Sequence, residues 1–138
     1  MSATNKFMTR GLLSPQMHGV LDYPLAVVLI AGPLVLSFDD RTATVIALVF
    51  GAAAAVLAVA TAWSTGIVHV IPPLLHGYID VVVTLAMIVL PFAVGFSSHT
   101  ATLVFYLVVG GGGLLATLVT RFESRMPLEH PAALPEAA

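Results

Sequence analysis

Cysteine is absent from the 138-residue chain. Its absence excludes a disulfide framework, a thiolate metal site and a cysteine nucleophile. Charged residues are also scarce: they make up 9% of the sequence, against 59% hydrophobic residues, whereas a soluble domain carries roughly a quarter charged residues. A chain with so few polar side chains cannot cover itself with a polar surface, so we expect it in a lipid bilayer.

Positive charge is too sparse for a nucleic-acid partner. Five Lys and Arg residues leave a net charge of -2, and no basic stripe is present, so nucleic-acid binding is not expected. The Walker loop, the G-x-S-x-G elbow and the H-E-x-x-H zinc motif are also missing. We therefore expect a membrane protein that is not an enzyme.

Long apolar segments occur four times, and each is about 20 residues long, the length that spans a hydrocarbon core of roughly 30 Å. The predicted helices cover residues 15–37, 42–63, 73–95 and 100–120. The predicted fold is an all-α bundle of four transmembrane helices.

A short pattern, H-G-x-x-D, occurs twice, from His18 to Asp22 and from His76 to Asp80, 58 residues apart. The same offset, without a gap, aligns further identical residues: Pro15 with Pro73, Ile30 with Ile88, Pro33 with Pro91, Phe38 with Phe96, and Thr42-Ala43-Thr44 with Thr100-Ala101-Thr102. We infer a tandem duplication of a two-helix unit.

The duplication divides the chain into five parts. The predicted parts are an N-terminal lead (1–14), repeat 1 (15–63), a connection (64–72), repeat 2 (73–121) and a C-terminal tail (122–138). The first repeat's two helices return the chain to its starting side, so both repeats insert in the same direction, related by an axis along the membrane normal.

Lys and Arg predict the orientation. Lys6 and Arg10 precede the first helix and Arg121 and Arg125 follow the last, whereas only Arg41 lies in a connection. An even number of spans places both termini on one side, and the positive-inside rule makes that side the cytoplasm. The lead, the 64–72 connection and the tail are therefore predicted to be cytoplasmic, in a multi-pass protein of the inner (plasma) membrane.

The two motifs predict a polar cluster inside the bundle. His and Asp four residues apart share one helix face, and a carboxylate in the apolar layer costs roughly 2.5–3.5 kcal/mol on insertion scales, so it needs a partner. The nearest partner is the His one turn earlier. His18 and His76 lie at the same predicted depth, so they converge with Asp22 and Asp80 if the first and third helices face each other.

Several roles fit such a cluster. The simplest is structural: His-Asp pairs that fix the packing of the first and third helices in a structural or accessory protein. His18 and His76 could instead be the axial ligands of haem b. The two His with Asp22 and Asp80 could bind a divalent metal, Zn²⁺ or Fe²⁺, or the carboxylates could couple protons to transport.

Other residues predict contacts rather than chemistry. Trp63 is expected as an interfacial aromatic, and His69, His99 and His130 are expected in solvent. The alanine run 52–55 and the glycine run 110–113 are small-residue packing surfaces. Besides membrane lipids, the expected partners are a second copy of the chain or a larger membrane complex.

The repeated unit resembles the SPW-repeat family of small bacterial membrane proteins. Members of that family have two spans per repeat and a Ser-Pro-Trp signature late in the first. The corresponding residues here are Gly32-Pro33-Leu34 and Leu90-Pro91-Phe92, in which only the proline matches. The resemblance covers about residues 15–120 and implies the fold, but no biochemical role.

Overall fold

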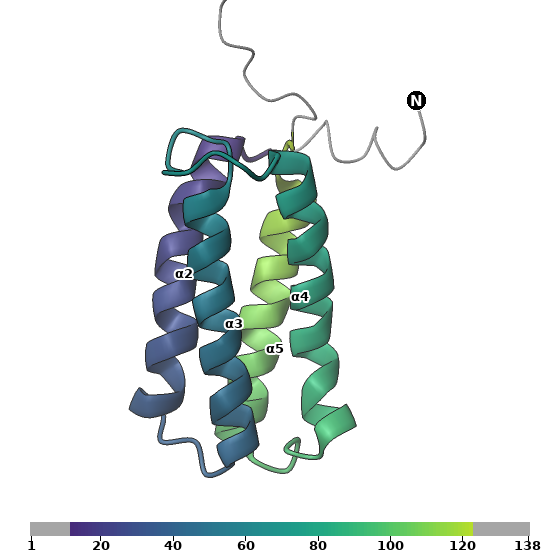
Figure 1. Cartoon of the computed structure of the whole chain (residues 1–138). Helices are drawn as coiled ribbons and strands as arrows, with labels where there is room; N and C mark the ends of the chain where they lie inside the picture. Colours follow the sequence, from purple (N-terminus) through teal and green to yellow (C-terminus); the bar gives the residue numbers. More distant parts are fainter. Residues whose placement is uncertain (1–11, 123–138) are drawn as a thin grey trace, which may run out of the picture.

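The computed structural model describes residues 12–122. Four helices run antiparallel to their chain neighbours and are joined at the two ends of the bundle (Figure 1). They are α2 (Pro15–Val35), α3 (Arg41–Ala60), α4 (Pro73–Val94) and α5 (Thr100–Val119). All four are long and apolar enough to cross a membrane. The predicted all-α bundle of four transmembrane helices is confirmed.

Local sequence signals explain where the helices begin and end. The Ser14 side chain accepts a hydrogen bond from the Met17 N–H, and a proline occupies the first turn of α2. Asp40 caps α3 in the same way, by accepting from the Ala43 N–H at 2.7 Å. α4 ends at Gly95, whose φ of 94° lies in the left-handed region that favours glycine.

The helices form two hairpins. α2 packs along α3 and α4 packs along α5, while contacts between the two hairpins are sparse. Small residues allow the close approach within each hairpin. A Cβ at Gly51 would lie 2.6 Å from Cγ1 of Ile30, and one at Gly110 would lie 3.1 Å from Cγ1 of Ile88. These equivalent contacts show that the hairpins are two copies of one structural unit.

The register of the second copy differs from the sequence expectation. α2 and α4 begin 58 residues apart, but α3 and α5 begin 59 residues apart, at Arg41 and Thr100, and also end 59 residues apart, at Ala60 and Val119. α4 and its following turn together contain one extra residue. The gapless alignment is therefore wrong beyond the turn, and the repeated Thr-Ala-Thr triplet does not occupy equivalent positions.

Backbone hydrogen bonds join the two ends of the described chain. The Leu13 N–H donates to the Val119 carbonyl at 2.9 Å, and the Arg121 N–H donates to the Leu13 carbonyl at 2.8 Å. The connection between α3 and α4 is tied down in the same way, because the Ala62 N–H donates to the Ile71 carbonyl at 2.8 Å. Both chain ends and this connection therefore lie at one end of the bundle (Figure 1), called the connection end below.

The packed core lies toward the opposite end of the bundle. It includes Leu29, Met87, Phe96, Phe105 and Tyr106, all buried. The Tyr106 hydroxyl donates a hydrogen bond of 2.6 Å to a carbonyl of α3, which links the two hairpins there. The connection end is held together by different groups.

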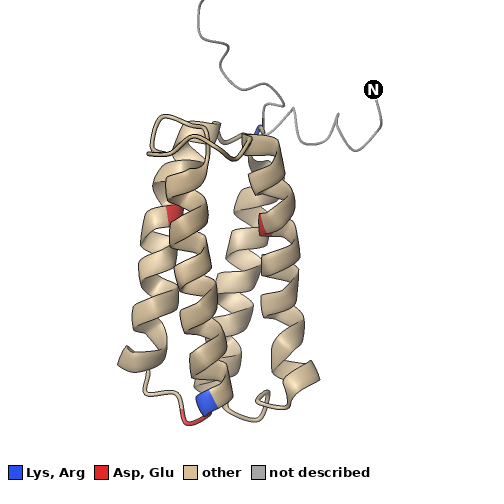
Figure 2. Ribbon diagram, in the orientation of Figure 1, with Lys and Arg blue, Asp and Glu red and all other residues tan. Residues whose placement is uncertain are grey.

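Acidic residues mark the two levels of the bundle (Figure 2). Among the described helices, acidic side chains occur only at Asp22 of α2 and Asp80 of α4. The two lie level with each other toward the connection end, whereas Asp39, Asp40 and Arg41 lie at the opposite end. The two motifs therefore share one depth, as the duplication predicts.

Candidate metal centre

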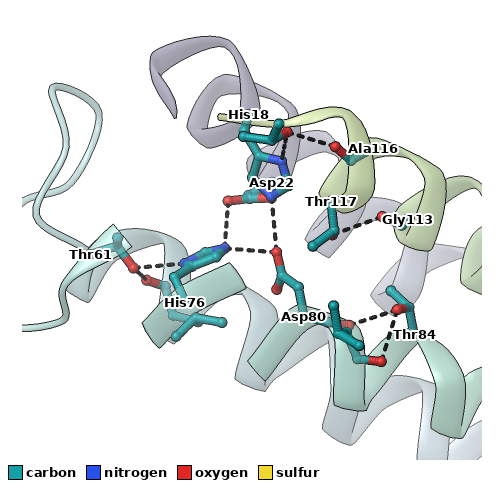
Figure 3. Close-up of polar contacts among 12 residues, drawn as sticks. His18, Asp22, Thr61, His76, Asp80, Thr84, Gly113, Ala116 and Thr117 are labelled. Carbon is teal, nitrogen blue, oxygen red and sulfur yellow. Dashed lines mark hydrogen bonds and ion pairs between the residues drawn. The ribbon is translucent and has the colours of Figure 1, made fainter. Parts of the chain in front are cut away.

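The four motif side chains meet between the two hairpins. His18 and Asp22 project from α2, and His76 and Asp80 project from α4 (Figure 3). One nitrogen or oxygen atom from each lies within 4.8 Å of those from the other three. The imidazole centroids are 5.6 Å apart, with the rings nearly perpendicular. The sequence thus singled out four residues that the fold brings together, in a group called the His-Asp cluster below.

Each carboxylate in the His-Asp cluster contacts both imidazoles. Between the hairpins, His18 Nε2 lies 2.9 Å from Asp80 Oδ2, and His76 Nε2 lies 3.3 Å from Asp22 Oδ2. Within the helices, the corresponding distances are 3.4 Å for His18–Asp22 and 3.1 Å for His76–Asp80. For Asp80 the nearest imidazole belongs to the other hairpin, not to the preceding turn as expected.

A threonine fixes the tautomer of His18. Its Nδ1 lies 2.8 Å from the Thr120 hydroxyl oxygen, and that hydroxyl donates to the Ala116 carbonyl at 2.6 Å. A hydroxyl has one hydrogen to donate, so the Thr120 oxygen must accept from the Nδ1–H of His18. In the neutral ring, the lone pair of Nε2 then points at the carboxylates.

His76 has the equivalent arrangement. Its Nδ1 lies 2.8 Å from the Thr61 hydroxyl oxygen, which donates to the Leu57 carbonyl at 2.6 Å. Each threonine follows the last helix of one repeat and orients the imidazole of the other. Hydrogen bonds at the remote nitrogen of a metal-binding His orient the ring in this way.

The centre of the His-Asp cluster requires a positive species. With both imidazoles protonated at Nδ1, a bare Nε2 faces carboxylate oxygens, and neither group can donate to the other. The buried atoms His76 Nε2 and Asp22 Oδ2 make no hydrogen bond of acceptable geometry within the described chain, although each lies within contact distance of its partners. Additional protons or a metal cation would satisfy these atoms.

The spacing suits a small tetrahedral cation. Zinc binds His nitrogen and carboxylate oxygen at 2.0–2.2 Å, so neighbouring ligand atoms of a tetrahedral site lie about 3.3 Å apart. The four His–Asp distances in the cluster range from 2.9 to 3.4 Å. Four such atoms can close around one ion without a change in the helix arrangement.

Aromatic rings enclose the His-Asp cluster at the connection end. The Trp63 ring lies 4.3 Å from the His76 ring, and the Phe122 ring lies 5.2 Å from the His18 ring. Trp63 is buried, so its expected place as an interfacial aromatic is wrong. A Cβ at Gly19 would lie 2.8 Å from Trp63, and one at Gly77 would lie 2.8 Å from Phe122. The motif glycines therefore make room for these rings.

Sequence reasoning missed the two threonines and Phe122. The signal was present as Thr61-Ala62-Trp63 and Thr120-Arg121-Phe122, which are equivalent at an offset of 59. The gapless offset of 58 hid it. Phe122 falls in the part of the chain assigned to the tail, yet it is fully buried.

The arrangement does not suit haem. A macrocycle bound by His18 and His76 would have to pass between the two imidazoles, where the carboxylates of Asp22 and Asp80 lie in contact with both rings. The cluster therefore fits a single ion better than haem b.

The other histidines lie apart from the cluster or outside the described residues. His69 is exposed, and its Nε2 lies 3.0 Å from the Trp63 carbonyl oxygen. His99 is partly exposed and lies at the opposite end of the bundle, 3.9 Å from Asp39. His130 lies outside the described residues. Solvent contact is thus confirmed for His69 and holds in part for His99.

Comparison with known proteins identifies the repeated unit. The model of the SPW repeat domain matches residues 16–120, which include both hairpins and the whole His-Asp cluster. No curated protein and no solved structure matches the chain. The match agrees with the resemblance seen in the sequence, although the signature retains only its prolines, Pro33 and Pro91, which are fully buried. The chain belongs to the SPW repeat family.

Proposed function

We propose that the protein is a non-enzymatic membrane protein whose two hairpins are joined by one divalent transition-metal ion. The ligands are His18, Asp22, His76 and Asp80, and the ion is Zn²⁺ or Fe²⁺, for which imidazole and carboxylate are suitable ligands. The observation that supports this most is the convergence of four donor atoms, two from each repeat, within 4.8 Å.

Charge balance favours an ion over a purely structural role. Two carboxylates in the apolar layer are costly unless their charge is compensated, and a divalent ion compensates both. The ion would also link α2 to α4, which belong to hairpins that otherwise contact each other sparsely. The structural role that the sequence suggests and the metal-binding role are therefore the same role.

The proposed setting is the inner (plasma) membrane, with both termini in the cytoplasm. The described chain ends meet at the connection end, and Arg121 lies there. Lys6, Arg10 and Arg125 flank the helices in the sequence, so the positive-inside rule favours this end as cytoplasmic. The His-Asp cluster then lies near the inner leaflet.

We also propose that the protein works as a homo-oligomer or as an accessory subunit of a larger membrane complex. A bundle of four helices has little interior, and many large apolar side chains face outward. Cross-linking in mild detergent should give dimers or a copurifying partner. Recovery of the monomer alone would contradict this part of the proposal.

Metal content tests the main proposal. Purified protein is stripped with a chelator, dialysed against Zn²⁺ or, without oxygen, Fe²⁺, and analysed for bound metal. We expect one ion per chain, its loss in His18→Gln and His76→Gln, and its retention in the control His99→Gln. If the chain stays metal-free, or the cluster variants bind as the wild type does, the metal site is refuted.

Proton-coupled transport is the second candidate, and one observation favours it: Asp22 and Asp80 both line an internal cavity. Proteoliposomes with an imposed membrane potential and a trapped pH dye test it. Proton flux that disappears in Asp80→Asn supports this function. Flux equal to that of empty liposomes, or unchanged in the variant, would rule it out.

A further inference from the structure

A cavity of about 550 Å³ lies between the His-Asp cluster and the packed core. Its volume falls within the range of small-molecule sites. All four helices contribute to its wall, which is mainly aliphatic; the larger apolar residues include Leu21, Leu25, Leu29, Phe50, Val83 and Met87. Two threonine hydroxyls in the wall already donate to carbonyls of their own helices. The polar groups left to face the cavity belong to the His-Asp cluster.

Small residues keep this space open. Ala52, Ala53 and Gly112 line the cavity. A Cβ at Gly112 would meet nothing within 4 Å, whereas one at Gly110 would lie 3.0 Å from Met87. Gly110 thus serves helix packing, but Gly112 does not. The small-residue runs that the sequence suggested as interfaces between proteins largely surround this internal space.

The cavity is wide enough for a bulky molecule. The eight residue steps from Ile79 to Met87 along its α4 wall rise about 12 Å, so the mean cross-section is about 45 Å². A straight alkyl chain, packed at the roughly 4 Å contact distance between carbon atoms, fills only part of that section. A ring system or a branched chain fits better.

Asp80 gives the cavity one polar anchor. Both of its contacts to imidazole nitrogens use Oδ2, and its side chain keeps 19% of its surface exposed where it lines the cavity. Its other oxygen is therefore available as an acceptor. An anionic head group would be repelled. A cationic one finds little net charge, because both carboxylates face imidazoles and, under the proposed function, the ion. A hydroxyl donor suits this acceptor.

The bilayer is the source of the ligand. Leu21 and Val56 line the cavity yet are 47% and 68% exposed, so the cavity wall continues onto the lipid-facing surface of the bundle. A molecule that enters there comes from the hydrocarbon layer and must itself be apolar.

We propose that the cavity binds a bilayer-soluble molecule with a bulky apolar body and a hydroxyl group that donates to Asp80. This site goes beyond the proposed metal function and does not require the ion, although the two sites share Asp80.

Four compounds with one ring system test the head-group chemistry. Protein in lipid nanodiscs is titrated by calorimetry with 2-naphthol, naphthalene, 2-naphthoate and 2-naphthylmethylamine, with empty nanodiscs as the blank. We expect 2-naphthol to bind about tenfold more tightly than naphthalene, the effect of a hydrogen bond to a charged acceptor. Equal affinity for these two, or tighter binding of the amine or the carboxylate, would overturn the proposal.

A pair of matched variants tests the location. Gly112→Leu fills the cavity and should weaken 2-naphthol binding about tenfold or more. Gly111→Leu lies beside it on α5, where a Cβ also meets nothing within 4 Å, but it does not line the cavity, so it should bind as the wild type does. Equal binding by the two variants would overturn the proposal. If Gly112→Leu does not fold, Ala53→Leu with the control Ala55→Leu replaces the pair.

The two proposals fail separately. His76→Gln should lose the metal ion and keep 2-naphthol binding, because His76 does not line the cavity, while Gly112→Leu should keep the ion. A metal-free wild type that still binds 2-naphthol refutes only the metal function. A protein that holds zinc but does not bind 2-naphthol refutes only the cavity ligand.

Discussion

Two threonine hydroxyls decide which nitrogen of each imidazole faces the carboxylates. Thr61→Val and Thr120→Val keep the shape but remove the acceptor for the Nδ1–H, so the ring can adopt the wrong tautomer. Loss of such a partner typically costs 10- to 100-fold in metal affinity, and we expect a loss of that order for zinc in each variant.

Zinc competition against a chelator measures this loss. Thr117→Val is the matched control, because the Thr117 hydroxyl donates only to the Gly113 carbonyl of its own helix. If all three variants bind zinc equally well, the threonines do not orient the imidazoles.

The motif glycines give a second prediction at the residue scale. Gly77→Ala places a Cβ 2.8 Å from the fully buried Phe122 ring. Overpacking costs about 1–3 kcal/mol, which exceeds the roughly 1 kcal/mol that alanine gains over glycine in a helix. The free energy of unfolding should fall.

Gly111→Ala is the control for the same helix-propensity gain, since its Cβ meets nothing, and it should leave stability equal or higher. Denaturant titration in detergent measures both variants. A Gly77→Ala variant as stable as Gly111→Ala would contradict the close packing of Phe122.

The sequence predicted the four cluster residues because carboxylates are rare in apolar segments and a repeat of such a pair is informative. It could not predict Thr61 or Thr120, because threonines are common in these helices and their role depends on contacts between the repeats. The burial of Trp63 was missed for a similar reason: a tryptophan at a helix end fits an interface and a cluster equally well.

At the scale of the elements, the helices were predictable and their register was not. Apolar segments as long as a bilayer is thick, with Ser, Pro and Gly at their ends, predict four helices to within a few residues. A shift of one residue between two apolar helices changes few identities, so the extra residue between α4 and α5 was invisible. Only packing, such as that of Gly51 and Gly110, reveals it.

The two hairpins are also not identical in their packing. Tyr106 of α5 is fully buried and donates to the Ala43 carbonyl of α3, whereas the equivalent position of α3 is Ala47. Tyr106→Phe removes one hydrogen bond between the hairpins and should lower the free energy of unfolding by about 1 kcal/mol. Thermal unfolding in detergent measures this. An unchanged midpoint would show that the bond contributes nothing to the hairpin contact.

For the whole molecule, the ion links two units whose other contacts are concentrated at the opposite end. A ligand that binds only the folded state at 100 times its dissociation constant stabilises that state by about 2.7 kcal/mol. Added zinc should therefore raise the unfolding temperature of the wild type. The combined variant His18→Gln with His76→Gln should show no rise, and a rise of equal size there would place the zinc effect elsewhere.

X-ray absorption spectroscopy of the zinc-loaded protein tests the central claim most directly. The account predicts four nitrogen or oxygen ligands at about 2.0–2.1 Å, with the outer-shell scattering of two imidazoles. A spectrum with one imidazole or none, or with six oxygen ligands, would contradict a centre built from both repeats.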